Sequence, residues 1–182
     1  MQRRSSRGPR GQASRDPSQK PAGRRTPPVG ALDAGLRLLS VRAHARAELR
    51  RKLGRRGYEA DEIEAAVGRL IELGYLDDSS FAQSLVRRRR ALRGPMALSA
   101  ELAARGVDRA QADAALAEFD PTEQLASATR LAERLYARKT VAGYREMLEV
   151  VGSRLVRRGF SPTIVRAACR AVLAGTSGDA EA

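Results

Sequence analysis

Side chains that could perform chemistry are scarce in this chain of 182 residues. His44 has no second histidine and no cysteine nearby to complete a metal site, and no nucleophile that it could activate is identifiable. Cys169 falls at an apolar-periodic position, which indicates a buried small side chain. Asp77 and Asp78 could serve acid–base or metal chemistry, but their place just before a helical pattern favours helix capping. Because no phosphate-loop, dinucleotide-binding or zinc-protease motif is present either, we expect a protein that is not an enzyme and that has no metal or cofactor.

Arginine is the abundant polar side chain, and the formal net charge is +13, from 34 Lys and Arg against 21 Asp and Glu. One interpretation is a solvated face that Glu48, Glu64 and Glu72 partly neutralise. We favour a face that binds a polyanion or a protein, because the acids do not match the arginines in density. The few aromatic residues fall mostly at packing positions, so stacking on nucleic-acid bases is not indicated. The candidate contact residues are Arg50, Arg51, Arg55, Arg87, Arg90 and Arg157.

The first 31 residues form a basic segment with eight Lys or Arg, one acid and five of the eight prolines. Such a composition cannot bury enough apolar surface to offset backbone ordering, so we expect a disordered tail. The tail could add weak, salt-sensitive affinity for nucleic acid, or it could be only a solubilising segment. No apolar stretch follows it that would indicate a secretion signal or a membrane span, and one cysteine fits a reducing compartment. We expect a cytoplasmic monomer with no membrane contact.

A repeat runs through the rest of the chain, marked by an Arg-Gly-apolar step at residues 56–58, 105–107 and 158–160. Apolar residues recur eight and four positions before each glycine, and six, ten and thirteen positions after it. In chain order these are Leu49, Leu53, Ile63, Val67 and Leu70, then Leu98, Leu102, Ala112, Leu116 and Phe119, then Val151, Leu155, Val165, Cys169 and Val172.

Each repeated glycine is predicted to end one helix in the left-handed conformation, with the next helix beginning two residues later. Helix starts are also predicted at Asp77-Asp78 and at Asp120-Pro121. We therefore predict an all-α fold of three tandem three-helix repeats, over residues 32–76, 77–120 and 121–174, followed by a flexible terminus at 175–182. Because about 45 residues cannot enclose a core, neighbouring repeats should share buried surface in an elongated, curved array.

Several of these segments resemble the RecX regulatory proteins of bacteria over about residues 36–174. They are LGRRGY at 53–58, LIELGYLDDSSFA at 70–82, GP at 94–95, ELAARGV at 101–107 and RRGF at 157–160. The resemblance implies three tandem three-helix repeats and no catalysis. This chain departs from the family in having Ala45 after the histidine, where a capping Ser or Thr is common, and in lacking a basic residue at 96–99.

The resemblance also implies a partner and a role. RecX proteins bind the RecA recombinase, chiefly as its filament on single-stranded DNA, and restrain its ATP hydrolysis, strand exchange and coprotease activity. We therefore expect a regulator of DNA repair and of the SOS response that binds RecA through the concave, basic face of its array. Tyr75, Leu76, Asp77 and Phe81 are expected to fix the junction between repeats. The alternatives are an autonomous DNA-binding protein of the helix-turn-helix type, which three equivalent turns disfavour, and a scaffold with an incidental basic tail.

Overall fold

The computed structural model describes residues 29–137 and 141–178, and within these ranges it contains helices and no strand. The prediction of an all-α fold is therefore confirmed. In chain order the elements are α1 (Ala31–Val41), α2 (Arg46–Arg55), α3 (Ala60–Glu72), α4 (Asp78–Arg89), α5 (Pro95–Arg105), α6 (Arg109–Ala117), α7 (Pro121–Tyr136), α8 (Tyr144–Met147), the π-helical η1 (Leu148–Gly152), α9 (Ser153–Arg157) and α10 (Pro162–Gly178).

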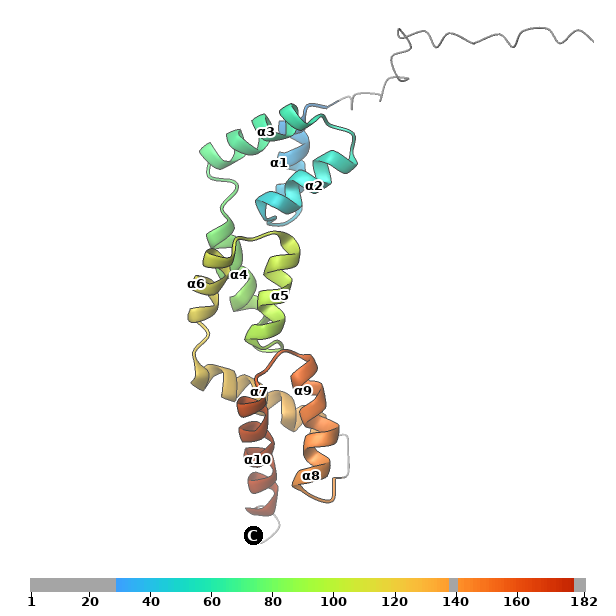
Figure 1. Ribbon diagram of the computed structural model, residues 1–182, viewed down its shortest axis with the longest axis vertical. Coiled ribbons are helices and arrows are strands. Elements are labelled where there is room, and N and C mark those ends of the chain that lie inside the picture. Colours follow the sequence, from blue (N-terminus) through green and yellow to red (C-terminus); the bar gives the residue numbers. More distant parts are fainter. Residues whose placement is uncertain (1–28, 138–140, 179–182) are drawn as a thin grey trace, which may run out of the picture.

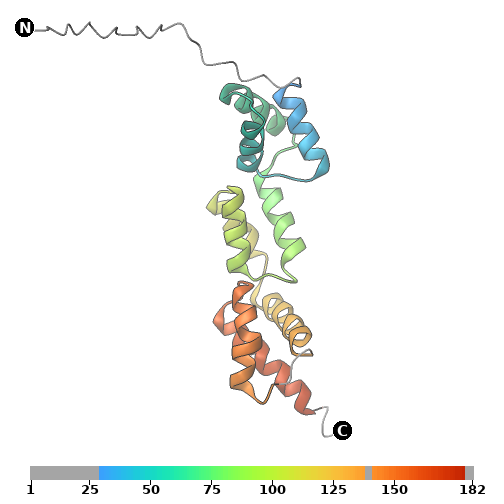
Figure 2. The ribbon, with the colours of Figure 1, turned by 90° about the vertical axis from the view of Figure 1, so that its right-hand side faces the viewer.

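Three groups of helices are stacked end to end into an elongated, bowed array (Figures 1 and 2). The first repeat contains α1 to α3, the second α4 to α6, and the third α7 to α10, in which α8, η1 and α9 follow one another as one helical rod. The middle helices α2, α5 and α8–α9 lie along the same side of the array, which is the right-hand side in Figure 1. A surface on that side can therefore draw on all three repeats.

The repeated apolar positions form the interior of each helix group. Those of the first repeat are buried, as are those of the third, including Cys169. In the second repeat Leu116 alone is half-buried, while the other four positions are buried. The residue after each repeated glycine is buried as well, namely Tyr58, Val107 and Phe160. The apolar period thus identified the buried side of each helix from sequence alone.

The turns also have the predicted conformation. Gly57, Gly106 and Gly159 have φ angles of 93°, 81° and 86°, in the left-handed region that favours glycine. The amide of Val107 donates to the Leu102 carbonyl at 3.1 Å, which closes the turn and satisfies a carbonyl at the end of α5. The following helices begin at the predicted residues, and the Asp108 carboxylate caps α6 by accepting from the Ala110 amide.

Burial is shared between neighbours less evenly than predicted. The second and third repeats enclose one continuous apolar cluster, whereas the first repeat encloses a separate cluster of its own. Ala45 is the only buried apolar residue of the first repeat that belongs to the larger cluster. The junction between the first two repeats must therefore be held largely by polar contacts.

The structure moves both predicted ends of the helical array outward. Residues 1–28 of the basic tail lie outside the described ranges, while Ala31 already forms the first turn of α1. At the other end α10 continues to Gly178 rather than ending at residue 174, so the Gly-Thr-Ser-Gly sequence extends the helix. Residues 179–182 lie outside the described ranges.

Candidate functional site at the repeat junctions

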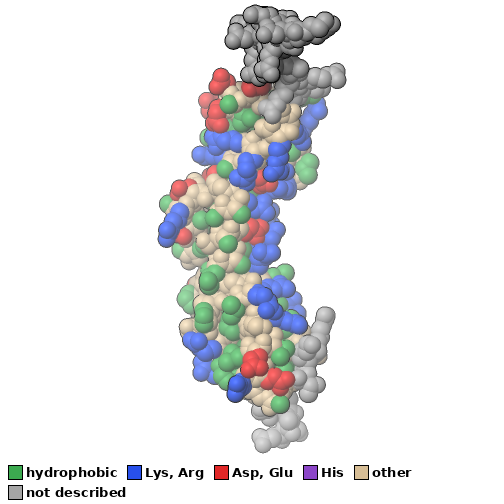
Figure 3. All heavy atoms as spheres, turned by 45° about the vertical axis from the view of Figure 1, so that its right-hand side comes forward, with side chains coloured by type: hydrophobic (Ala, Val, Ile, Leu, Met, Phe, Trp, Pro, Cys, Tyr) green, Lys and Arg blue, Asp and Glu red, His purple; other side chains and the backbone are tan. Residues whose placement is uncertain are grey.

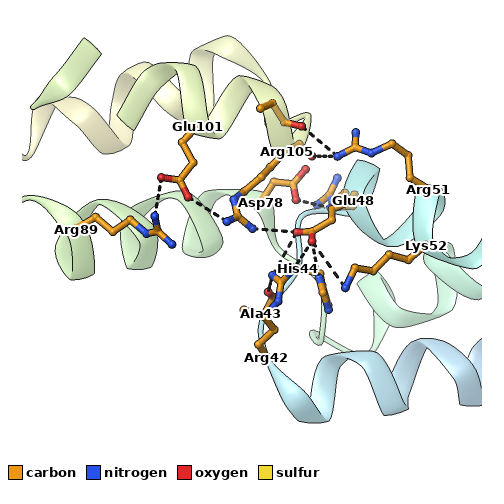
Figure 4. A network of polar contacts seen from close by, with 12 residues as sticks. Arg42, Ala43, His44, Glu48, Arg51, Lys52, Asp78, Arg89, Glu101 and Arg105 are labelled. Carbon is orange, nitrogen blue, oxygen red and sulfur yellow. Dashed lines mark hydrogen bonds and ion pairs between the residues drawn. The ribbon is translucent and has the colours of Figure 1, made fainter. Parts of the chain in front are cut away.

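Glu48, in the first turn of α2, lies at the centre of a polar network between the first and second repeats (Figure 4). Its carboxylate accepts hydrogen bonds from the guanidinium groups of Arg42 and Arg105, and its Oε1 lies 3.2 Å from His44 Nδ1. Burial by itself would raise the pKa of Glu48, but the Arg42 hydrogen bond and the nearby His44 outweigh it and lower the pKa to about 2. Glu48 is therefore an anion at neutral pH.

The network continues through Arg105 into the second repeat. Arg105 donates to Glu48 at 3.2 Å and to Glu101 at 3.0 Å, and Glu101 in turn pairs with Arg89 at 3.1 Å. The Arg105 guanidinium also lies over the Phe81 ring, 5.8 Å from its centroid. Part of the charge of the chain is therefore engaged in ion pairs that join the two repeats and is not free on the surface.

His44 is buried beside this network, with its side chain 1% exposed. Burial lowers the pKa of His44, and the nearby Glu48 only partly opposes that effect. The imidazole is therefore neutral at neutral pH and has an interhelix role. No three His, Cys, Asp or Glu side chains of residues 29–137 and 141–178 come together as a metal site requires.

Asp78 links the same two repeats in a way that the sequence did not indicate. Asp77 caps its own helix, accepting from the amides of Ser79 and Ser80 at 2.9 and 3.3 Å. Asp78 is buried and accepts from the Arg46 amide at 2.8 Å, in the first turn of α2. The prediction that both aspartates cap α4 is therefore wrong for Asp78, because its carboxylate reaches an unpaired amide on the neighbouring repeat.

The second and third repeats meet through main-chain contacts. The amides of Gly94 and Met96 donate to the carbonyls of Arg158 and Gly159, at 2.8 and 3.1 Å. A Cβ atom on Gly159 would lie 2.2 Å from the Ala97 amide nitrogen, so only glycine allows this approach. The Arg158 guanidinium adds a hydrogen bond to the Leu92 carbonyl at 3.3 Å.

Beside this contact lies a hollow of about 530 Å³, which we name the second-junction groove. Its lining residues are Arg93, Ala97, Leu135, Arg154, Arg157 and Arg158. No carboxylate of the described part of the chain lines the groove, although Glu101 lies 3.7 Å from the Arg93 guanidinium. Four cationic side chains thus border one hollow without an equal number of anions.

The six predicted contact arginines separate into two kinds. Arg50 forms two hydrogen bonds with Glu64, Arg51 donates to the Ala104 carbonyl, and Arg90 pairs with Glu123. These three side chains are engaged within the chain. The other three have exposed side chains that form no ion pair or side-chain hydrogen bond with the described residues: Arg55, Arg87 and Arg157.

The four residues expected at the junction also lie in different surroundings. Leu76 is buried in the core of the first repeat, Asp77 caps α4, and Phe81 is buried beneath Arg105. The Tyr75 side chain is 59% exposed and borders a surface hollow against α1 instead of lying between repeats. The aromatic ring therefore takes no part in the junction network.

Of the residues that border the second-junction groove, only Arg157 is among the predicted contact residues. A signal was present, because Arg105 and Arg158 both occupy the position before a repeated glycine. In the structure each reaches back to the preceding repeat, Arg105 to Glu48 and Arg158 to the Leu92 carbonyl. The repeated arginine therefore marks where one repeat meets the one before it.

On the face shown in Figure 3, Lys and Arg side chains gather over the lower part of the first repeat and along both edges of the second and third. Hydrophobic side chains are scattered between them. None of the helices that the structure describes is both long and apolar enough to cross a membrane. The fold and its junctions thus define a helical tandem-repeat protein with basic grooves between its repeats.

Known proteins share this architecture and sequence. The family model for the first three-helix domain of RecX matches residues 31–70, and that for the second matches residues 77–116. The regulatory protein RecX of Mycolicibacterium smegmatis is 37% identical over 162 residues, which cover 86% of this chain and 82% of the relative. That of Xanthomonas axonopodis pv. citri is 39% identical over 158 residues, covering 84% and 95%. A crystal structure of RecX from Lactobacillus salivarius superposes with a TM-score of 0.70 at 27% identity, covering 78% of this chain and 94% of that one.

The chain therefore belongs to the RecX family of regulatory proteins. The resemblance first seen in short segments, such as GYLDD at 74–78, extends over most of the chain.

Proposed function

We propose that this protein binds the filament of RecA on single-stranded DNA and restrains its ATP hydrolysis, strand exchange and coprotease activity. It would thereby regulate DNA repair and the SOS response, acting in the cytoplasm as a monomer without catalysing a reaction. Membership of the RecX family is the observation that carries this proposal. We also propose that the repeats divide at the predicted boundaries, which fall in the loops between α3 and α4 and between α6 and α7.

The arrangement of the charges supports this function. The middle helices lie along one side of a long array, and both junctions on that side are bordered by arginine. A filament presents its partner surface repeatedly along its length, so an elongated array can contact it at several points at once. Arg55, Arg87 and Arg157 are the predicted contact residues whose charges remain available, since no described residue pairs with them.

The test is to add the full chain, in substoichiometric amounts, to RecA with single-stranded DNA and to follow ATP hydrolysis. The proposal predicts that hydrolysis falls progressively and stops responding well before one chain is present per RecA. No inhibition at any ratio would contradict it. Tight, sequence-selective binding to duplex DNA without RecA would instead support an autonomous DNA-binding protein.

A further inference from the structure

The second-junction groove differs from the two hollows at the first junction in how its charges are paired. One of those hollows is bordered by five cationic side chains and by the carboxylates of Glu48 and Glu101. The other is bordered by Arg42, Arg88, Arg89 and Arg105, of which all but Arg88 are ion-paired with Glu48 or Glu101. The second-junction groove is bordered by four arginines and, among the described residues, by no carboxylate. Like charges held around one hollow repel each other, so an anion from outside the chain would relieve that repulsion. Arg154 and Arg157 therefore leave this groove with positive charge that no described residue pairs.

Hydrogen-bond donors are also free in this groove. Arg154 and Arg157, on successive turns of η1–α9, form no ion pair or side-chain hydrogen bond with the described residues. The Arg158 guanidinium donates one hydrogen bond to the Leu92 carbonyl, and the Arg93 guanidinium lies 3.7 Å from the Glu101 carboxylate. Each guanidinium carries five N–H donors in a planar fork, so most of those facing the groove lack a partner.

We propose that the second-junction groove binds the phosphate groups of a nucleic-acid strand without reading its sequence. The guanidinium fork matches two oxygens of one phosphate, which makes arginine the side chain best suited to this anion. The remaining wall consists of Ala97 and Leu135, with no aromatic ring on which a base could stack. The groove therefore recognises the backbone and leaves the bases uncontacted. This assignment rests on the proposed function in one respect, since in the cell the strand would be the DNA within the filament.

The fold positions the backbone that carries these arginines. The carbonyls of Arg158 and Gly159 are hydrogen-bonded to the first turn of α5, so the end of α9 cannot move independently of the second repeat. Arg93 directly precedes Gly94, whose amide takes part in the same contact. The backbone that carries these arginines is therefore positioned before a strand arrives, which reduces the entropy lost on binding.

The test measures binding of the full chain to a labelled oligothymidylate in the absence of RecA, by fluorescence anisotropy over a range of salt concentrations. The double variant R154Q/R157Q removes two charges from the groove. The control variant R109Q/R145Q removes two charges outside the groove, on α6 and α8, from side chains that are 93% and 97% exposed. All variants retain the basic tail, so its contribution cancels. We expect R154Q/R157Q to weaken binding roughly tenfold and to reduce the salt slope by about 1.4, at about 0.7 for each lost phosphate contact. R109Q/R145Q should change binding less than threefold, on the order of the screened effect of distant charges.

An equal loss in both double variants would overturn the proposal, because the attraction would then be diffuse. Unchanged DNA binding by R154Q/R157Q would overturn it as well, and a simultaneous loss of RecA inhibition would then assign the groove to an acidic protein surface. Inorganic tripolyphosphate is the second probe, and it should compete only weakly at equal phosphate concentration. Saturation of the groove by tripolyphosphate with no displacement by the oligonucleotide would overturn the assignment to a strand.

Two controls keep the result interpretable. Arg154 and Arg157 are exposed, so the thermal midpoint of R154Q/R157Q should equal that of the natural chain. The variant R154K/R157K retains both charges without the guanidinium fork and should bind with intermediate affinity. Because these measurements contain no RecA, failure of the proposed function would appear separately, as unchanged ATP hydrolysis by RecA in the presence of the natural chain.

Discussion

The Asp78 carboxylate accepts a hydrogen bond from the Arg46 amide at 2.8 Å, although the two residues belong to different repeats. The N-cap of α2 is Ala45, whose methyl side chain cannot accept a hydrogen bond. An amide in the first turn of a helix has no partner within that helix. The second repeat therefore supplies a polar partner for the start of a helix in the first, and this stabilises the helix and the junction together.

Replacing Asp78 with alanine should lower the free energy of unfolding by about 1–3 kcal/mol, because a buried amide loses its acceptor. The measurement is urea unfolding followed by circular dichroism. Asp61→Ala is the matched control, since Asp61 is an exposed first-turn acid of α3, and it should cost only about 0.3–1 kcal/mol through the helix dipole. Equal losses in the two variants would contradict the capping role of Asp78.

Glu48→Gln should lower the free energy of unfolding at neutral pH by on the order of 2–3 kcal/mol. The pKa of Glu48 is about 2 in the folded chain, against an ordinary value of 4.5, so the folded state favours the anion. That contribution is complete above the unfolded pKa and is lost as the pH falls from about 5 towards 2. The difference between the two proteins should therefore shrink on acidification, as measured by urea unfolding at several pH values.

Glu64→Gln is the matched control for this experiment, because Glu64 also pairs with an arginine but is 59% exposed. Its loss should change the free energy of unfolding little, as for other solvent-exposed ion pairs. His44 acts in the same direction as Glu48, since a lowered pKa makes protonation below about pH 6.5 destabilising. A Glu48→Gln protein whose stability deficit stays constant down to pH 2 would contradict the assignment.

Gly159→Ala and Gly57→Ala should have very different effects. Both residues have left-handed backbone angles, which cost an alanine about 1–2 kcal/mol. A Cβ on Gly57 would meet nothing within 4 Å, whereas one on Gly159 would lie 2.2 Å from the Ala97 amide nitrogen. We expect Gly159→Ala to lose about 1–3 kcal/mol more than Gly57→Ala in urea unfolding, through overpacking at the second junction. Similar losses would mean that the two repeats do not pack through this turn.

The sequence predicted which side of each helix is buried, but it did not predict the contacts between repeats. The spacing of Leu49 and Leu53 identifies their buried side because helical geometry places residues four apart on one face. The same spacing cannot show that Arg51 reaches the Ala104 carbonyl, since that contact depends on how two repeats pack. For this reason half of the predicted contact arginines proved to be engaged within the chain, while Arg154 and Arg158 were not among the predicted contacts.

The most direct test of the central claim is to compare binding of the labelled full chain to three targets under the same salt conditions. The targets are RecA alone, single-stranded DNA alone, and the filament assembled from both. The account predicts the highest affinity for the filament, with a clear loss in the variant R55Q/R87Q/R157Q. This variant removes the three predicted contacts that are exposed and that pair with no described residue. Binding to the filament that is no tighter than binding to bare single-stranded DNA would contradict the account.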